Sequence, residues 1–100
     1  MFIAMNRFRI VLGKEAQFEN IWKNRESYLE EVPGFIEFNL IKGLSNDKFT
    51  LYASHSKWKS EKDFSNWTKS KSFKLAHKNA GQHKTFYIGH PEFEGFKVVI

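Results

Sequence analysis

Four histidines, one amide in a strand-like run and many aromatic side chains are the residues of this chain that bear on chemistry. The histidines are His55, His77, His83 and His90, and their spacings do not form the paired ligands of a helix-borne zinc site. The chain has no Gly-rich phosphate loop, no HExxH or GxSxG motif, no catalytic carboxylate pair and no cysteine. Hydrolase, nucleotide-binding and thiolate chemistries therefore lack the groups they need.

Asn6 lies in an alternating run over residues 2–12, on a face that is otherwise apolar. A buried amide must find a hydrogen-bond partner or it costs on the order of 1 to 3 kcal/mol. Asn6 therefore either bonds nearby backbone or donates into a ligand site. Both interpretations stay open at this point.

Trp67 and His77 are expected on two short helical stretches. Trp67 follows Phe64 by one turn, and His77 ends a stretch that also contains Phe73. Taken alone, Trp67 is a core residue and His77 a solvated or hydrogen-bonded helix residue. Ten residues of continuous helix would turn the two side chains roughly 80° apart and separate them by about 15 Å. A break at residues 70–72, which are rich in the cap-forming residue serine, would let both face one cleft.

The remaining periodicities predict the elements that position these residues. In chain order these are a strand at 2–12, a helix from 14 to 29, strands at 35–44 and 48–58, a helix that begins after Ser60, a short helical stretch closed by 79–81, and strand runs at 85–88 and 93–99. The order β-α-β-β-α-β predicts a ferredoxin-like α+β sandwich, with helices on one face of an antiparallel sheet. One hundred residues are enough for one such domain, spanning residues 1–100.

The face of the sheet without helices needs cover, and a second copy of the chain is the simplest one. The 17% aromatic content exceeds what so small a core buries. We therefore expect a homodimer with two sheets packed face to face, a dimeric α/β barrel, with Phe38 at the interface.

Composition also limits the compartment and the partners. The absence of cysteine is typical of a reducing compartment, and residues 1–10 contain no long apolar run, so we expect a cytoplasmic protein without a membrane span. The net charge is +5, but the lysines between residues 57 and 84 alternate with aromatic residues at helical spacing. This pattern indicates the solvated side of a helix, and no nucleic-acid-binding motif accompanies it.

Three segments together resemble the IsdG-type haem-degrading monooxygenases of the antibiotic biosynthesis monooxygenase (ABM) superfamily. They are Met5-Asn6-Arg7-Phe8, Phe64-Ser65-Asn66-Trp67 and Phe73-Lys74-Leu75-Ala76-His77. The resemblance covers almost the whole chain. Its specificity lies in the Asn, Trp and His residues, because the fold alone is shared by many unrelated functions.

The resemblance implies that haem is both cofactor and substrate. It places His77 on the haem iron, Asn6 beside the ligand on the oxygen-binding side, and Trp67 against a distorted haem plane, with Phe64 and Phe73 also lining the site. An external electron donor, a reductase or a small reductant, would support attack by O₂ on a meso carbon, opening of the ring and release of iron. Arg7, Arg9, Arg25, Lys74 and Lys78 are all candidates to meet the haem propionates.

Two rival functions remain open. A cofactor-independent monooxygenase of the same superfamily, acting on a quinol or another aromatic compound, would also use Asn6 and Trp67. A haem-binding carrier would bind through His77 without turnover. The residue that separates the cofactor-independent rival from the other two is His77.

Overall fold

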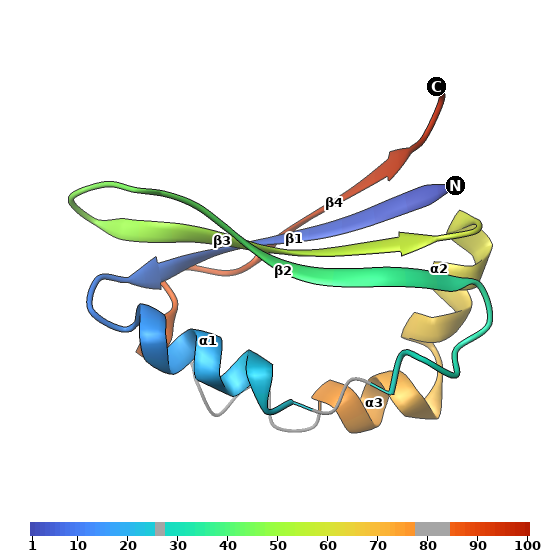
Figure 1. The fold of residues 1–100 in the computed structure, drawn as a ribbon, viewed down its shortest axis with the longest axis horizontal. Helices are drawn as coiled ribbons and strands as arrows, with labels where there is room; N and C mark the ends of the chain where they lie inside the picture. Colours follow the sequence, from blue (N-terminus) through green and yellow to red (C-terminus); the bar gives the residue numbers. More distant parts are fainter. Residues whose placement is uncertain (26–27, 78–84) are drawn as a thin grey trace.

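The computed structural model describes residues 1–25, 28–77 and 85–100, and its elements follow the predicted order. They are β1 (Phe2–Val11), α1 (Glu15–Lys23), β2 (Phe35–Ser45), β3 (Phe49–Trp58), α2 (Glu61–Thr68), α3 (Lys71–His77) and β4 (Glu92–Lys97). The strands form one antiparallel sheet in the order β2-β3-β1-β4, with the three helices on one face (Figure 1). The predicted ferredoxin-like α+β fold is confirmed. None of the described helices is long and apolar enough to cross a membrane.

The core under the helices is divided into two clusters along the central strands β1 and β3. The clusters are Phe2, Ala4, Leu29 and Trp58, and Phe8, Ile10, Phe18 and Tyr52. Between them on the same sheet face lie Asn6 of β1 and Ser54 of β3, which are only half-buried. The predicted alternation of the first strand is therefore confirmed, and its polar position falls in the gap between the two clusters.

The position of Phe38 differs from the sequence prediction. The pairing of β2 with β3 shifts register between Phe35 and Glu37, which is the signature of a bulge. The extra residue brings Phe38 to the same face as Phe35, and its ring stacks on Trp22 of α1 at 5.7 Å with an interplanar angle of 11°. The expectation of Phe38 at a sheet-to-sheet interface is wrong, because a bulge inverts the alternation of every residue that follows it.

The first helix is shorter than predicted. It ends at Lys23, not at Leu29, and Tyr28 has a φ of +57°, which a right-handed helix does not accommodate. Leu29 is nevertheless buried in the first core cluster. Leu29, at the end of the predicted apolar stripe, is therefore buried outside a helix, whereas Tyr28 of the same stripe is exposed.

The C-terminal part of the chain also differs in detail from the prediction. Within the predicted strand at 85–88, Tyr87 makes only an isolated bridge to Ile10. The last strand, predicted at 93–99, is found at Glu92–Lys97. The expected helix end at 79–81 and His83 lie outside the described residues.

Side-chain hydrogen bonds lie at the turn and at the helix starts that the sequence predicted. Asn46 Oδ1 accepts two backbone N–H bonds in the hairpin turn, at 2.8 and 2.9 Å. Ser60 Oγ accepts the N–H of Asp63 at 3.1 Å and so caps α2. Ser70 Oγ accepts the N–H of Phe73 at 3.2 Å and begins α3. The predicted helix break is therefore present, at residues 69–70 at the start of the predicted stretch 70–72, and α2 and α3 run in different directions (Figure 1).

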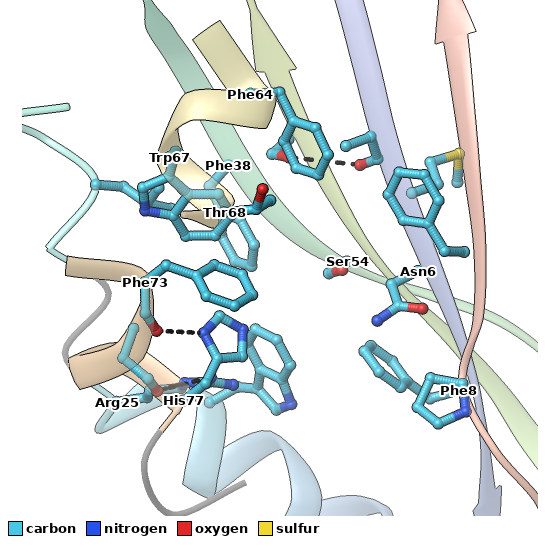
Figure 2. A pocket seen from close by; sticks show the side chains of 18 of the residues that line it. Asn6, Phe8, Arg25, Phe38, Ser54, Phe64, Trp67, Thr68, Phe73 and His77 are labelled. Atoms are coloured by element: carbon cyan, nitrogen blue, oxygen red, sulfur yellow. Dashed lines mark hydrogen bonds between the residues drawn. The ribbon is translucent and has the colours of Figure 1, made fainter. Parts of the chain in front are cut away.

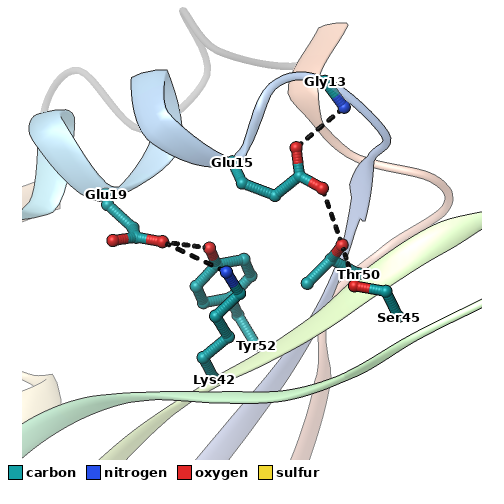
Figure 3. Close-up of polar contacts among 7 residues, drawn as sticks. All are labelled: Gly13, Glu15, Glu19, Lys42, Ser45, Thr50 and Tyr52. Atoms are coloured by element: carbon teal, nitrogen blue, oxygen red, sulfur yellow. Dashed lines mark hydrogen bonds and ion pairs between the residues drawn. The ribbon is translucent and has the colours of Figure 1, made fainter.

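Polar contacts fix α1 on the sheet (Figure 3). Glu15 accepts a hydrogen bond from Thr50 Oγ1 at 2.8 Å, and Thr50 in turn accepts one from Ser45 Oγ at 2.7 Å. The bond from Thr50 is the largest of several contacts that lower the pKa of Glu15. Tyr52 donates to Glu19, and burial together with this carboxylate raises the pKa of the phenol. These contacts hold α1 so that its last turn, with Trp22, covers the cavity described next.

Candidate active site

A cavity of about 960 Å³ lies between the sheet and the helices. This volume is at the upper end of the range of roughly 300–1,000 Å³ found for small-molecule sites. The structure brings to its wall all five residues that the family resemblance placed in the site: Asn6, Phe64, Trp67, Phe73 and His77. Most other lining residues are apolar or aromatic. Figure 2 shows Asn6 on the sheet side and Trp67, Phe73 and His77 on the helix side.

The break between α2 and α3 brings Trp67 and His77 together. Their ring centroids are 6.0 Å apart, where a straight helix would separate the residues by about 15 Å. Phe73 contacts both rings, with centroids 4.8 Å from Trp67 and 4.0 Å from His77. The Ser70 hydroxyl donates to the carbonyl of Trp67 at 2.6 Å, and this bond links the residue before α3 to the last turn of α2. The sequence prediction of a shared cleft is confirmed.

The hydrogen bond of His77 determines which ring nitrogen carries the proton. Nδ1 lies 2.8 Å from the carbonyl oxygen of Phe73, and since a carbonyl only accepts, Nδ1 is the protonated nitrogen. Nε2 then carries the lone pair, and it has no hydrogen-bond partner in residues 1–25, 28–77 and 85–100. Burial lowers the pKa of His77, the bond to Phe73 opposes this, and the charge of Arg25 lowers it further. The net result at neutral pH is a neutral imidazole with a free lone pair.

Arg25 ties the chain after α1 to the last turn of α3. Its Nε and Nη2 donate to the carbonyl of Ala76 at 3.0 and 2.7 Å, next to His77. The guanidinium carbon also lies 4.7 Å from the ring centroid of Trp22. Sequence analysis missed this contact, because Arg25 and Ala76 are 51 residues apart and no local pattern links them.

Trp67 and Asn6 are among the cavity-wall residues whose polar side-chain groups have no hydrogen-bond partner in the described part of the chain. The indole N–H of Trp67 is buried, and neither it nor the amide of Asn6 makes a hydrogen bond to residues 1–25, 28–77 or 85–100. A buried donor without a partner costs about 1–3 kcal/mol, and such groups concentrate at functional sites. Of the two interpretations left open for Asn6, the structure favours the amide that faces a ligand site.

The geometry can be set beside known proteins. The chain matches the Antibiotic biosynthesis monooxygenase (ABM) family over residues 1–79. It belongs to this family. An ABM chain of this kind resembles a heme-degrading monooxygenase of Bacillus thuringiensis (strain Al Hakam), with 27% identity over 81 residues that cover 81% of this chain and 75% of the relative.

Two solved structures show the same fold as this ABM chain. One is the heme degrader MhuD from Mycobacterium tuberculosis with two hemes in its active site, with a TM-score of 0.76, 21% identity, and coverage of 100% and 97% of the two chains. The other is SnoaB, a cofactor-independent oxygenase from Streptomyces nogalater, with a TM-score of 0.65, 18% identity, and coverage of 97% and 92%. Structures with this fold therefore include a haem degrader and an oxygenase that uses no cofactor.

The basic residues considered for propionate binding are mostly elsewhere in this ABM chain. Arg7 and Arg9 form ion pairs with carboxylates of β4. Neither they nor Lys74 line the cavity, and Lys78 lies outside the described residues. Among the described candidates only Arg25 reaches the cavity wall. Ser54 also lines the cavity and was not among the predicted site residues. The signal that could have identified it is the presence of a polar residue on the otherwise buried face of β3.

Proposed function

We propose that this ABM monooxygenase degrades haem, which it binds as both cofactor and substrate. The observation that carries the proposal is the Nε2 lone pair of His77, which no described residue engages and which lies on the wall of an aromatic cavity, across from Asn6. A neutral imidazole is a common axial ligand of haem iron, and its orientation is usually fixed by a hydrogen bond from the other nitrogen to a carbonyl. The Phe73 carbonyl supplies that bond. The name of the Bacillus thuringiensis relative supports the same choice.

The residues present fit this group. The cavity volume and the aromatic walls suit a flat, largely apolar macrocycle. Arg25 also lines the cavity, and the N–H groups that it does not use on the Ala76 carbonyl could bind a haem propionate. When bound, haem supplies the iron that reacts with O₂, with electrons from an external reductase or small reductant. The proposed products are an opened tetrapyrrole and free iron.

Each residue of the chain then has a stated part. His77 holds the iron from α3, and the tie between Arg25 and Ala76 keeps the last turn of α3 in place. From the sheet side, Asn6 would donate a hydrogen bond to the ligand on the oxygen-binding side of the haem. Trp67 would contact the ring from the helix side, and together with Phe73 it would exclude water. These roles are proposals that the positions in Figure 2 support.

The test is to add hemin to the apoprotein and then a reductant in air, following the Soret band. Binding followed by loss of the band supports the proposed function. Stable binding without turnover overturns it in favour of a carrier, and absence of binding favours a cofactor-independent oxygenase. A His55→Ala variant is the matched control, because His55 lines a hollow on the other face of the sheet. Of the other described histidines, only His90 lines the cavity, so His90→Ala tests the alternative ligand.

We also propose that the chain forms a homodimer through the sheet face opposite the described helices. Ile41 and Phe96 are exposed, at 41% and 38%, and a hollow on this face is lined by Ile3, Met5 and Phe96 among others. Apolar side chains in such numbers on one face are typical of an interface. The same face of a second copy would cover them with a two-fold axis.

A further inference from the structure

In each of the two central strands, the row of buried side chains that faces the helices contains one residue that is only half-buried, and in both strands this residue is polar. In β1 the even-numbered side chains are buried except for Asn6, and in β3 they are buried except for Ser54. The two residues are direct partners in the antiparallel register. Their Cβ atoms are therefore about 4.5–5.5 Å apart. Both line the cavity, at the gap between the two core clusters (Figure 2).

The hydroxyl of Ser54 differs from the other aliphatic hydroxyls on the cavity wall. Ser56 Oγ accepts the indole N–H of Trp58 at 2.9 Å, and Thr68 Oγ1 donates to a backbone carbonyl of its own helix at 2.7 Å. Ser54 makes no hydrogen bond to the described part of the chain, and neither does the Asn6 amide. Two adjacent polar groups thus face an aromatic cavity, and neither has a hydrogen-bond partner among the described residues.

We propose that Ser54 is a second hydrogen-bonding residue on the oxygen-binding side, and that it and Asn6 together hold one small ligand, a water molecule or a diatomic molecule. This inference rests on the proposed function. The amide offers two donors and the hydroxyl one, and the spacing of their Cβ atoms lets both reach the same ligand atom. In a cavity whose wall is mostly apolar and aromatic, such bonds are stronger than they would be in water.

The test uses carbon monoxide as the probe. Hemin is bound to the protein, reduced under argon and exposed to CO, and the C–O stretching frequency is measured by infrared spectroscopy. A hydrogen-bond donor near the ligand oxygen lowers this frequency. Ser54→Ala should therefore shift it upward, in the same direction as Asn6→Ala, and the double variant should have the highest frequency of the set.

Ser56→Ala is the matched control, because it removes the same atom from the same face of the same strand. Its hydroxyl is already bonded to Trp58, so its loss should leave the CO frequency unchanged and lower the urea midpoint of unfolding. Ser54→Ala should show the reverse, a shifted frequency and an unchanged midpoint.

Two outcomes would overturn the inference, and they are distinguishable. If wild-type protein does not bind hemin, the proposed function and this inference are both wrong. If it binds and degrades haem, but Ser54→Ala has the wild-type CO frequency, only the role of Ser54 is wrong.

Discussion

Replacing each of two neighbouring tryptophans by phenylalanine tests whether the indole N–H of Trp67, unpaired among the described residues, lowers the free energy of unfolding. Trp58 and Trp67 have ring centroids 5.3 Å apart in the same part of the core. Trp58 is fully buried and its N–H donates to Ser56. The N–H of Trp67 is buried and has no hydrogen-bond partner among the residues that the structure describes. The substitution removes the same atoms at both positions, but it breaks a hydrogen bond only at Trp58.

The size of the difference follows from these contacts. Trp58→Phe loses a hydrogen bond with a net contribution of about 0.5–1.5 kcal/mol. Trp67→Phe removes an unpaired donor that costs about 1–3 kcal/mol, and this gain offsets part of its lost packing. Trp58→Phe should therefore be the less stable variant by roughly 1.5–4.5 kcal/mol. The greater burial of Trp58 adds to the difference in the same direction.

Urea unfolding of the apoprotein, with equal m-values for all three proteins, measures this difference. We expect Trp67→Phe to unfold near the wild-type midpoint and Trp58→Phe well below it. In thermal unfolding, each kcal/mol corresponds to about 4–8 °C for a domain of this size. Equal losses at the two positions, or a larger loss for Trp67→Phe, would mean that the Trp67 N–H is paired in solution and that the reasoning is wrong.

Other changes test the proposed roles and the proposed assembly. His77→Ala should leave a folded protein but abolish haem turnover in the hemin and reductant assay, and parental turnover would refute the ligand assignment. Since the pKa of His77 lies below 6.5, its Nε2 stays free as the pH falls through 6.5, and hemin affinity from Soret titrations should decline only at lower pH. A decline centred at or above pH 6.5 would contradict this. Asn6→Ala should bind hemin while its turnover falls far more than its affinity, and equal losses would argue against a role beyond binding. Trp67→Ala should lose most turnover and change the NMR spectrum of the cyanide-bound ferric complex; if both are unchanged, Trp67 is only a core residue. Ile41→Asp should shift the protein toward monomer in analytical ultracentrifugation, and a wild-type monomer at micromolar concentration would rule out the homodimer.

Much of the arrangement around the cavity was predictable because its signals are local. The alternation of residues 2–12 placed Asn6 on the buried face of its strand, and the serines at 70–72 predicted the break that brings Trp67 and His77 together. Caps and periodicity depend on residues within a few positions of one another. For the same reason the element order, and with it the fold, followed from the sequence.

The features that only the tertiary structure decided all join distant segments. The bulge in β2 turned Phe38 toward the helices, and only the register of β1 against β3 makes Ser54 the partner of Asn6. The tie from Arg25 to α3 spans 51 residues. Sequence periodicity gives the face of a strand but neither its partner nor its register, because these are set by how separate elements share one core. The sequence by itself thus determined which residues of β1 face inward, and the bulge in β2 and the packing of distant elements determined which other residues meet them around the cavity.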